Sequence, residues 1–180
     1  MYKATFKYNI NLIFFMILSR DEILKEIKNG NIKITPFNKN NIGPASIDLT
    51  LGNEFRIFTK NKIDLKDIDY RKITKLIKKD KIIIKPGQLI LGITKETIKL
   101  AENLAGKIEG RSRYARVGLL VHISSSFVHP GINNKQVLEI KNDSNSEMIL
   151  YSGLKICQLI ISEVKGKARY NGKFQNQEKL

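Results

Sequence analysis

The 180-residue sequence has one cysteine, two histidines and no tryptophan. Because Cys157 is alone, an intrachain disulfide is impossible, and nothing else in the sequence points to secretion. His122 and His129 have no third metal ligand at a zinc-binding spacing. We therefore expect no protein-bound zinc, and the disulfide-rich secreted class is excluded.

Long apolar runs are also missing. The run at residues 10–18, INLIFFMIL, has nine residues, of which only Asn11 is polar. A helix that crosses a bilayer needs about 20 apolar residues, and no small-residue cleavage site follows this run. We expect no membrane partner and a cytoplasmic location. The organised pattern begins at Met16, so we interpret residues 1–15 as an N-terminal extension or a start-site artefact, with a short membrane-proximal anchor as the alternative.

Acidic residues are scarce. The sequence has 17 Asp and Glu against 32 Lys and Arg, which gives a net charge of +15. Much of the lysine is scattered among isoleucine and asparagine, which is typical of biased composition and a soluble surface. A positive field also attracts polyanions, either nucleic acid or nucleoside triphosphates. Composition alone leaves these interpretations open.

The patterns that are present indicate one globular β domain at residues 16–164. Ser19 can cap a helix at 19–29, Glu22 completes a capping box, and Asn29-Gly30 ends the helix. Short strands with turn signals about every ten residues then predict an all-β barrel or sandwich. Strands are expected at 32–34, 45–51, 54–58, 82–84, 89–94, 105–108, 119–123, 136–141, 148–151 and 156–164.

Two segments depart from the strand pattern. Residues 59–80 are rich in lysine and aspartate, and we interpret them as an exposed excursion with one short helix near 70–77. The tail, residues 165–180, is polar and basic. We expect the tail to be disordered or to be ordered only by a ligand.

The basic turn at residues 110–116 is a candidate phosphate site. Arg111, Arg113 and Arg116 carry guanidinium forks that match phosphate oxygens, and the Ser112 hydroxyl and the turn amides add donors. A solvated basic turn or a nucleic-acid contact explains the same residues equally well.

Glu139 is the candidate for proton transfer. It shares a strand face with Val137, while Leu138 and Ile140 share the other face. A partly buried carboxylate suits proton transfer near neutrality, because burial favours its protonated form. An ordinary exposed strand position is the alternative.

Other polar residues have weaker signals. His122 lies in an apolar run, which favours a satisfied core histidine, and His129 precedes a Pro-Gly hairpin, where we expect exposure. Ser124, Ser125 and Ser126 leave room for a ring to dock against the backbone, or form a simple polar turn. The tail residues that could close over a phosphate chain are Lys173, Gln175 and Gln177.

Six separated segments, in order along the chain, resemble the dCTP deaminase branch of the dUTPase-like trimeric enzymes. They are MILSRDEI at 16–23, GPASIDLTLG at 43–52, EGRSRYARVGLLVH at 109–122, FVHPGINNKQVLEIKN at 127–142, YSGLKICQLI at 151–160 and GKFQNQ at 172–177. The third resembles the family motif E-G-R-S-S-x-A-R-x-G-x-x-V-H, and the second resembles P-x-S-x-D-L-x-L-G. Six such segments in register are a specific match.

The resemblance implies a mainly β fold, a distorted β-barrel of the dUTPase-like (β-clip) type with a short N-terminal helix. It implies a homotrimer with active sites between subunits, and hydrolytic deamination of dCTP to dUTP with Mg²⁺ on the triphosphate. By position, Glu139 matches the general base, while Ser112 and Arg116 match residues that a neighbouring subunit donates to support the water and the leaving ammonia. The positions that match substrate contacts are Arg111, Ser112, Arg113, Ser124, Ser125, Gln158, Tyr170, Lys173 and Gln177. The tail would close over the nucleotide, dTTP is a candidate inhibitor, and no nucleic-acid partner is expected.

A metal-free mechanism agrees with the cysteine count. Zinc deaminases activate water with a metal held by H-x-E and P-C-x-x-C motifs. Cys157 alone cannot supply these ligands, so a carboxylate in a closed pocket must activate the water, and Glu139 is the best candidate.

Five positions depart from the family pattern. Arg113 replaces a second serine, Asn134 a hairpin glycine, Ser125 a small apolar residue, and Cys157 a glycine. His129 replaces an aspartate that braces the site in deaminases and belongs to the catalytic motif of dUTPases. The alternatives to dUTP release are therefore a bifunctional deaminase that gives dUMP, a dUTP diphosphatase, and a catalytically weakened protein that binds nucleotides or nucleic acid.

Overall fold

The computed structural model describes residues 16–66 and 68–180. The predicted N-terminal extension, residues 1–15, lies outside this part. The elements are α1 (Arg20–Lys28), β1 (Ile32–Thr35), η1 (Lys39–Asn41), β2 (Ile47–Phe58), α2 (Tyr70–Ile73), β3 (Thr74–Lys78), β4 (Lys81–Ile84), β5 (Leu89–Leu100), β6 (Leu104–Gly110), α3 (Ser112–Ala115), β7 (Leu119–Val121), β8 (Phe127–Val128), β9 (Asn133–Asn142), β10 (Met148–Tyr151) and β11 (Lys155–Glu163).

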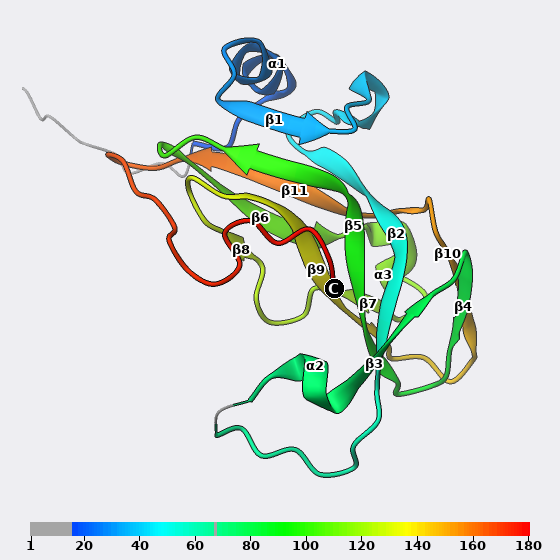
Figure 1. Ribbon diagram of the computed structural model, residues 1–180. Coiled ribbons are helices and arrows are strands. Elements are labelled where there is room, and N and C mark those ends of the chain that lie inside the picture. The colour runs from blue at the N-terminus through cyan, green and yellow to red at the C-terminus, as the bar shows by residue number, and fades with distance from the viewer. Residues whose placement is uncertain (1–15, 67) are drawn as a thin grey trace, which may run out of the picture.

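Strands dominate the structure, as predicted, and the helices are short. The main sheet follows the order β7-β9-β5-β2-β11-β6-β8, with β1 paired to β5 and β3 paired to β2. This sheet curls into a half-barrel, and β4 and β10 form a separate two-stranded sheet at one end (Figure 1). The helix α1 lies beside β1, away from this small sheet (Figure 1), so the mainly β fold with a short N-terminal helix is confirmed.

The alternation of apolar residues places the core inside the curled sheet. In β9, Leu138 and Ile140 are fully buried, whereas Val137 and Glu139 on the other face are half-buried. Phe55 of β2 is also fully buried. Each such side chain stabilises the fold by ~1.5–3 kcal/mol through its removal from water. The core therefore fixes the strand that carries Glu139.

The helix α1 has half of its predicted capping box. Ser19 Oγ accepts a hydrogen bond from the Glu22 amide at 3.4 Å. The Glu22 carboxylate accepts from Lys25 Nζ at 3.0 Å, so it is engaged along the helix surface. Ile23 is buried, and Gly30 follows the C-cap Asn29 with a φ of 78°.

Two predicted breaks in the strands are wrong. The expected turn at Gly52 lies inside β2, where the pairing with β5 shifts register between Leu51 and Phe55. A Cβ at Gly52 would lie 3.0 Å from the Ile93 carbonyl oxygen, so glycine here permits a close backbone approach and not a turn. Likewise β5 continues to Leu100, with a register shift between Ile93 and Thr97.

The predicted helix near 70–77 is also too long. Only Tyr70–Ile73 is helical, and the chain then pairs with β2 as β3. Ile77 lies opposite Phe55 in this pairing and packs against the core. Cross-strand burial has overridden the local helical pattern.

The tail, residues 165–180, contains no helix or strand but has many contacts within the chain. The Asn133 amide donates to the Gln175 carbonyl at 3.2 Å, and the Lys135 amide donates to the Gln177 carbonyl at 2.8 Å. The tail, red in Figure 1, therefore runs beside β9. The expectation that only a ligand would order it is corrected, because backbone and apolar contacts order it here. Its closure over a nucleotide stays a prediction.

No helix in the described part of the chain is both long enough and apolar enough to cross a membrane.

Candidate active site

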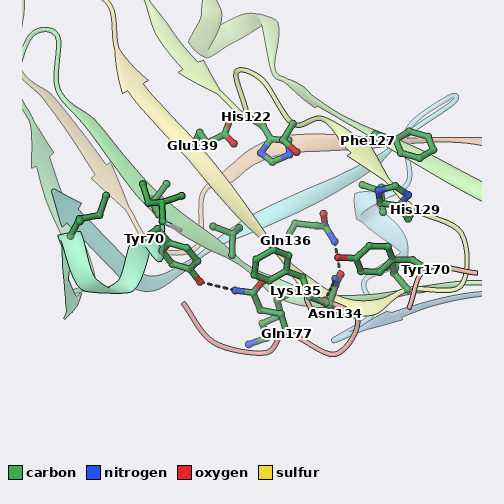
Figure 2. Close-up of a pocket in the computed structure, with 18 of the residues that line it drawn as sticks. Tyr70, His122, Phe127, His129, Asn134, Lys135, Gln136, Glu139, Tyr170 and Gln177 are labelled. Atoms are coloured by element: carbon green, nitrogen blue, oxygen red, sulfur yellow. Dashed lines mark hydrogen bonds between the residues drawn. The ribbon is translucent and has the colours of Figure 1, made fainter. Parts of the chain in front are cut away.

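A cavity of about 580 Å³ lies between β9, the loop at 122–129, α2 and the tail (Figure 2). Most of its lining is apolar or aromatic. The polar groups on its wall are His122, Ser125, His129, Asn134, Lys135, Gln136, Glu139 and Gln177. A largely apolar cavity with a few convergent polar groups is typical of a small-molecule site.

Glu139 reaches this cavity from β9, as its strand face predicts. Its Oε2 accepts two hydrogen bonds from Ser124, from the amide at 3.0 Å and from Oγ at 3.2 Å. These bonds fix one carboxylate oxygen and leave the other free of protein donors among the described residues. A half-buried carboxylate held in this way can accept a proton from a bound water.

His122 brings Ser124 to Glu139. Its amide donates to the Glu139 carbonyl at 2.7 Å, which ends the pairing of β7 with β9, and its φ of 60° turns the chain away from the strand. Left-handed φ values are uncommon outside glycine, and histidine is among the residues that adopt them most readily. The strained turn therefore lets the loop return over the carboxylate.

The His122 side chain differs from its predicted role. It lines the cavity, and its buried Nδ1 has no hydrogen-bond partner in the part of the chain that the structure describes, so the interpretation as a satisfied core histidine is wrong. Burial lowers the pKa of His122, while the nearby Glu139 carboxylate opposes this shift. The imidazole is consequently held neutral beside the candidate base. The sequence had one signal for this role, because His122 closes the family motif.

Phe127, His129 and Tyr170 form an aromatic column on another wall of the cavity (Figure 2). The His129 ring stacks on Tyr170 with 4.8 Å between centroids, and Phe127 meets the His129 ring edge-on at 4.7 Å. Exposure of His129 agrees with the prediction. The histidine thus joins the hairpin to the tail.

The basic turn lies apart from this cavity. Ser112, Arg113 and Arg116 are exposed on and beside α3, and none of them lines the Glu139 cavity. Arg111 donates to Asp48 Oδ2 at 3.1 Å. Gln158 lies beside this turn and donates to the Gly110 carbonyl at 3.3 Å.

Within one chain, the candidate residues therefore fall into separate groups. Glu139, Ser125, Tyr170 and Gln177 line the cavity, and Ser124 is bonded to Glu139. The turn residues and Gln158 form a second group. Lys173 lines a neighbouring hollow of about 500 Å³ with Tyr70 and other tail residues.

Sequence reasoning missed several wall residues. Tyr70 of α2 lines the cavity, and its hydroxyl accepts from Gln177 Nε2 at 3.2 Å. Ile68 of the same excursion also lines it, as does Phe127 at the start of the 127–142 motif. Residues 59–80 are expected to be exposed and contain no motif, so the sequence has no signal that they line the cavity.

Groups of three or more His, Cys, Asp or Glu side chains that could hold a metal ion are not found in residues 16–66 and 68–180.

Solved structures identify the fold as dUTPase-like. A dCTP deaminase from Agrobacterium tumefaciens aligns with a TM-score of 0.65 at 16% identity, over 83% of this chain and 48% of that one. The present chain thus spans about half the length of that protein. A dUTPase from phage phi11 of S. aureus aligns with a TM-score of 0.50 at 12% identity, over 79% and 96% of the two chains.

Sequence comparison gives the family. The model of the dCTP deaminase-like family matches residues 17–164. A protein of Parafrankia sp. named "dCTP deaminase, dUMP-forming" is 32% identical over 90% of this chain and 87% of its own. A protein of the same name from Streptomyces coelicolor is 32% identical over 90% and 91%. The chain belongs to the dCTP deaminase-like family.

Proposed function

We propose that this protein is an enzyme that deaminates dCTP and releases dUMP. The observation that carries the proposal is the Glu139 carboxylate, held by Ser124 on the wall of an apolar cavity. The names of the relatives support the substrate, and they favour dUMP, which the sequence left as an alternative, over dUTP as the product.

In the first step, water adds to C4 of the cytosine ring. Glu139 accepts a proton from this water and passes protons to the ring and to the amino group, which leaves as ammonia. His122 is held neutral by burial, so no imidazolium pairs with the carboxylate that accepts the proton. The balance is dCTP and water to dUTP and ammonia.

In the second step, a water attacks the α-phosphorus, and pyrophosphate leaves to give dUMP. Arg111, Arg113, Lys173 and Gln177 are the proposed contacts to the triphosphate, because guanidinium, ammonium and amide groups all donate to phosphate oxygens. Mg²⁺ would arrive bound to the triphosphate as part of the substrate.

We further propose a homotrimer with the site completed between subunits. Support comes from the separation of the exposed Ser112 and Arg116 from the Glu139 cavity within one chain. A neighbouring copy could bring this turn to the cavity and supply donors for the water and the leaving ammonia. Inhibition by dTTP is a further proposal, since a thymine nucleotide would compete for the same cavity.

The test is incubation of the purified protein with dCTP and Mg²⁺, with ammonia, pyrophosphate, dUTP and dUMP followed separately. We expect ammonia and pyrophosphate in equal amounts, without accumulation of dUTP. Ammonia with accumulating dUTP would contradict the second step only. Absence of ammonia release would contradict the whole proposal.

A second candidate function is suggested by His129. Because it offers an imidazole where the family has a carboxylate, the cavity could bind nucleotides with little turnover. Nucleotide binding by calorimetry with no product would favour this candidate over the enzyme.

A further inference from the structure

A binding site for the end of the tail lies next to the Glu139 cavity. Leu180 is only 6% exposed, and its side chain packs against Leu91 and Ile93 in a small apolar cluster of its own. Its amide donates to Glu54 Oε2 at 3.3 Å, and its carbonyl accepts from Arg56 Nη2 at 3.2 Å. Donor, acceptor and side chain of this one residue are therefore all engaged.

Arg56 is unusual for a buried cation. It is 9% exposed, and no Asp or Glu side chain of the described residues forms an ion pair with it, since the nearby Glu54 pairs with Lys78. Its guanidinium donates to Thr74 Oγ1 at 3.2 Å and lies 5.6 Å from the centre of the Tyr70 ring. Its Nε has no hydrogen-bond partner within residues 16–66 and 68–180. A buried charge is costly unless its donors are satisfied, so removal of the Leu180 carbonyl leaves Arg56 with a second unmet donor. The arginine thus favours the docked tail.

The same cluster is connected to the cavity. Tyr70 lies between Arg56 and the cavity wall, and its hydroxyl accepts from Gln177 Nε2. Three residues before Leu180, the Gln177 carbonyl is held by the Lys135 amide of β9 at 2.8 Å. Docking of Leu180 therefore fixes Gln177 in its position on the cavity wall.

We propose that Glu54, Arg56 and the Leu91–Ile93 surface form a clamp for Leu180, and that this clamp positions Gln177 for nucleotide binding. The inference rests on the proposed function for its kinetic part only. Arg56 is not among the residues that line the Glu139 cavity, so it is a positioning residue. If the clamp opens, the closed tail becomes a minor state, and the apparent affinity for nucleotide falls by the fraction of chains that remain closed.

The test uses Leu180→Ala and Arg56→Met in the full chain. The matched controls are Leu180→Met, which conserves volume, and Lys179→Ala, which removes an exposed neighbouring side chain. We expect the two clamp variants to raise the KM for dCTP about 10-fold with kcat within about 2-fold, because the open fraction affects binding and not chemistry. The controls should match the wild type.

A second readout is independent of turnover. The Asn133 and Lys135 amides donate to tail carbonyls, so their hydrogen exchange in nucleotide-free protein should accelerate about 10-fold in Leu180→Ala, while exchange at 138–142 stays unchanged. Unchanged exchange at both amides would overturn the clamp. Faster exchange with an unchanged KM would overturn its positioning role. If the wild type turns over no dCTP, the exchange result still decides the clamp, and only the proposed function fails.

Discussion

Replacement of Glu139 by glutamine tests the proposed chemistry most directly. Glutamine has the same shape, and its side-chain oxygen can still accept from the Ser124 amide and hydroxyl, which lie 3.0 and 3.2 Å from Glu139 Oε2. The substitution therefore removes the negative charge and the ability to take a proton, but it leaves the loop at 122–129 in place.

The expected effects on rate and stability differ in size. Loss of a general base lowers kcat about 10²–10⁴-fold, which corresponds to ~3–5 kcal/mol of transition-state stabilisation. Two hydrogen bonds to a charged acceptor become bonds to a neutral one, a change of about 1–2 kcal/mol at most for a half-buried group. For a chain of this size, that shifts the Tm by only about 2–8 °C.

The assay is ammonia release from dCTP at saturating substrate, with thermal unfolding measured on the same preparation. Ser124→Ala is the control, because the carboxylate keeps the Ser124 amide bond and loses only the hydroxyl bond. This variant should lose about 3–10-fold in kcat, as expected for one hydrogen bond. A Glu139→Gln enzyme within 10-fold of the wild type would refute the assignment of Glu139 as the base.

Three further predictions concern the assembly, the product and the pH range. Mixing Glu139→Gln with Ser112→Ala subunits should restore activity at about a quarter of the sites of randomly mixed trimers, and no recovery in verified mixed trimers would contradict a shared site. His129→Asp should raise the rate of pyrophosphate release from added dUTP, and an unchanged rate measured by product chromatography would show that His129 does not limit the second step. Burial lowers the pKa of His122 below its ordinary 6.5. The stability that the neutral imidazole contributes is therefore full above pH 6.5 and is lost as the pH falls through the lowered pKa. Between pH 7.5 and 5, the Tm of His122→Gln should fall less than the Tm of the wild type.

Sequence patterns correctly predict the elements that depend only on neighbouring residues in the chain. The N-cap at Ser19, the end of α1 at Asn29 and the two faces of β9 all follow from residue type and spacing, and the structure confirms them. The family resemblance likewise assigns Glu139 and Ser124 to one substrate site, and the two residues are hydrogen-bonded to each other.

The errors share a physical cause, which is contact between distant parts of the chain. Gly52 was interpreted as a turn because the close approach of β5 has no signal in the neighbouring residues. The helix predicted near 70–77 gives way where Ile77 pairs opposite Phe55. Neither the tail contacts with β9 nor the strained φ of His122 could be predicted, since each depends on a strand far away in the sequence.

The contacts of the tail show what the unusual histidine at position 129 does in this structure. The stacked His129 and Tyr170 rings attach the beginning of the tail to the hairpin, and the Tyr170 amide also donates to the Pro130 carbonyl at 3.0 Å. Ten residues later, Arg56 and Glu54 hold Leu180. Lys173 and Gln177, the proposed phosphate contacts, lie between these two attachments. A carboxylate at position 129 could not stack in this way. With histidine there, the site has one acidic group fewer, but the beginning of the tail is held in place. It follows that His129→Asp should loosen the tail while it improves phosphate chemistry. The two effects should appear separately, as faster hydrogen exchange at Asn133 and faster release of pyrophosphate from added dUTP.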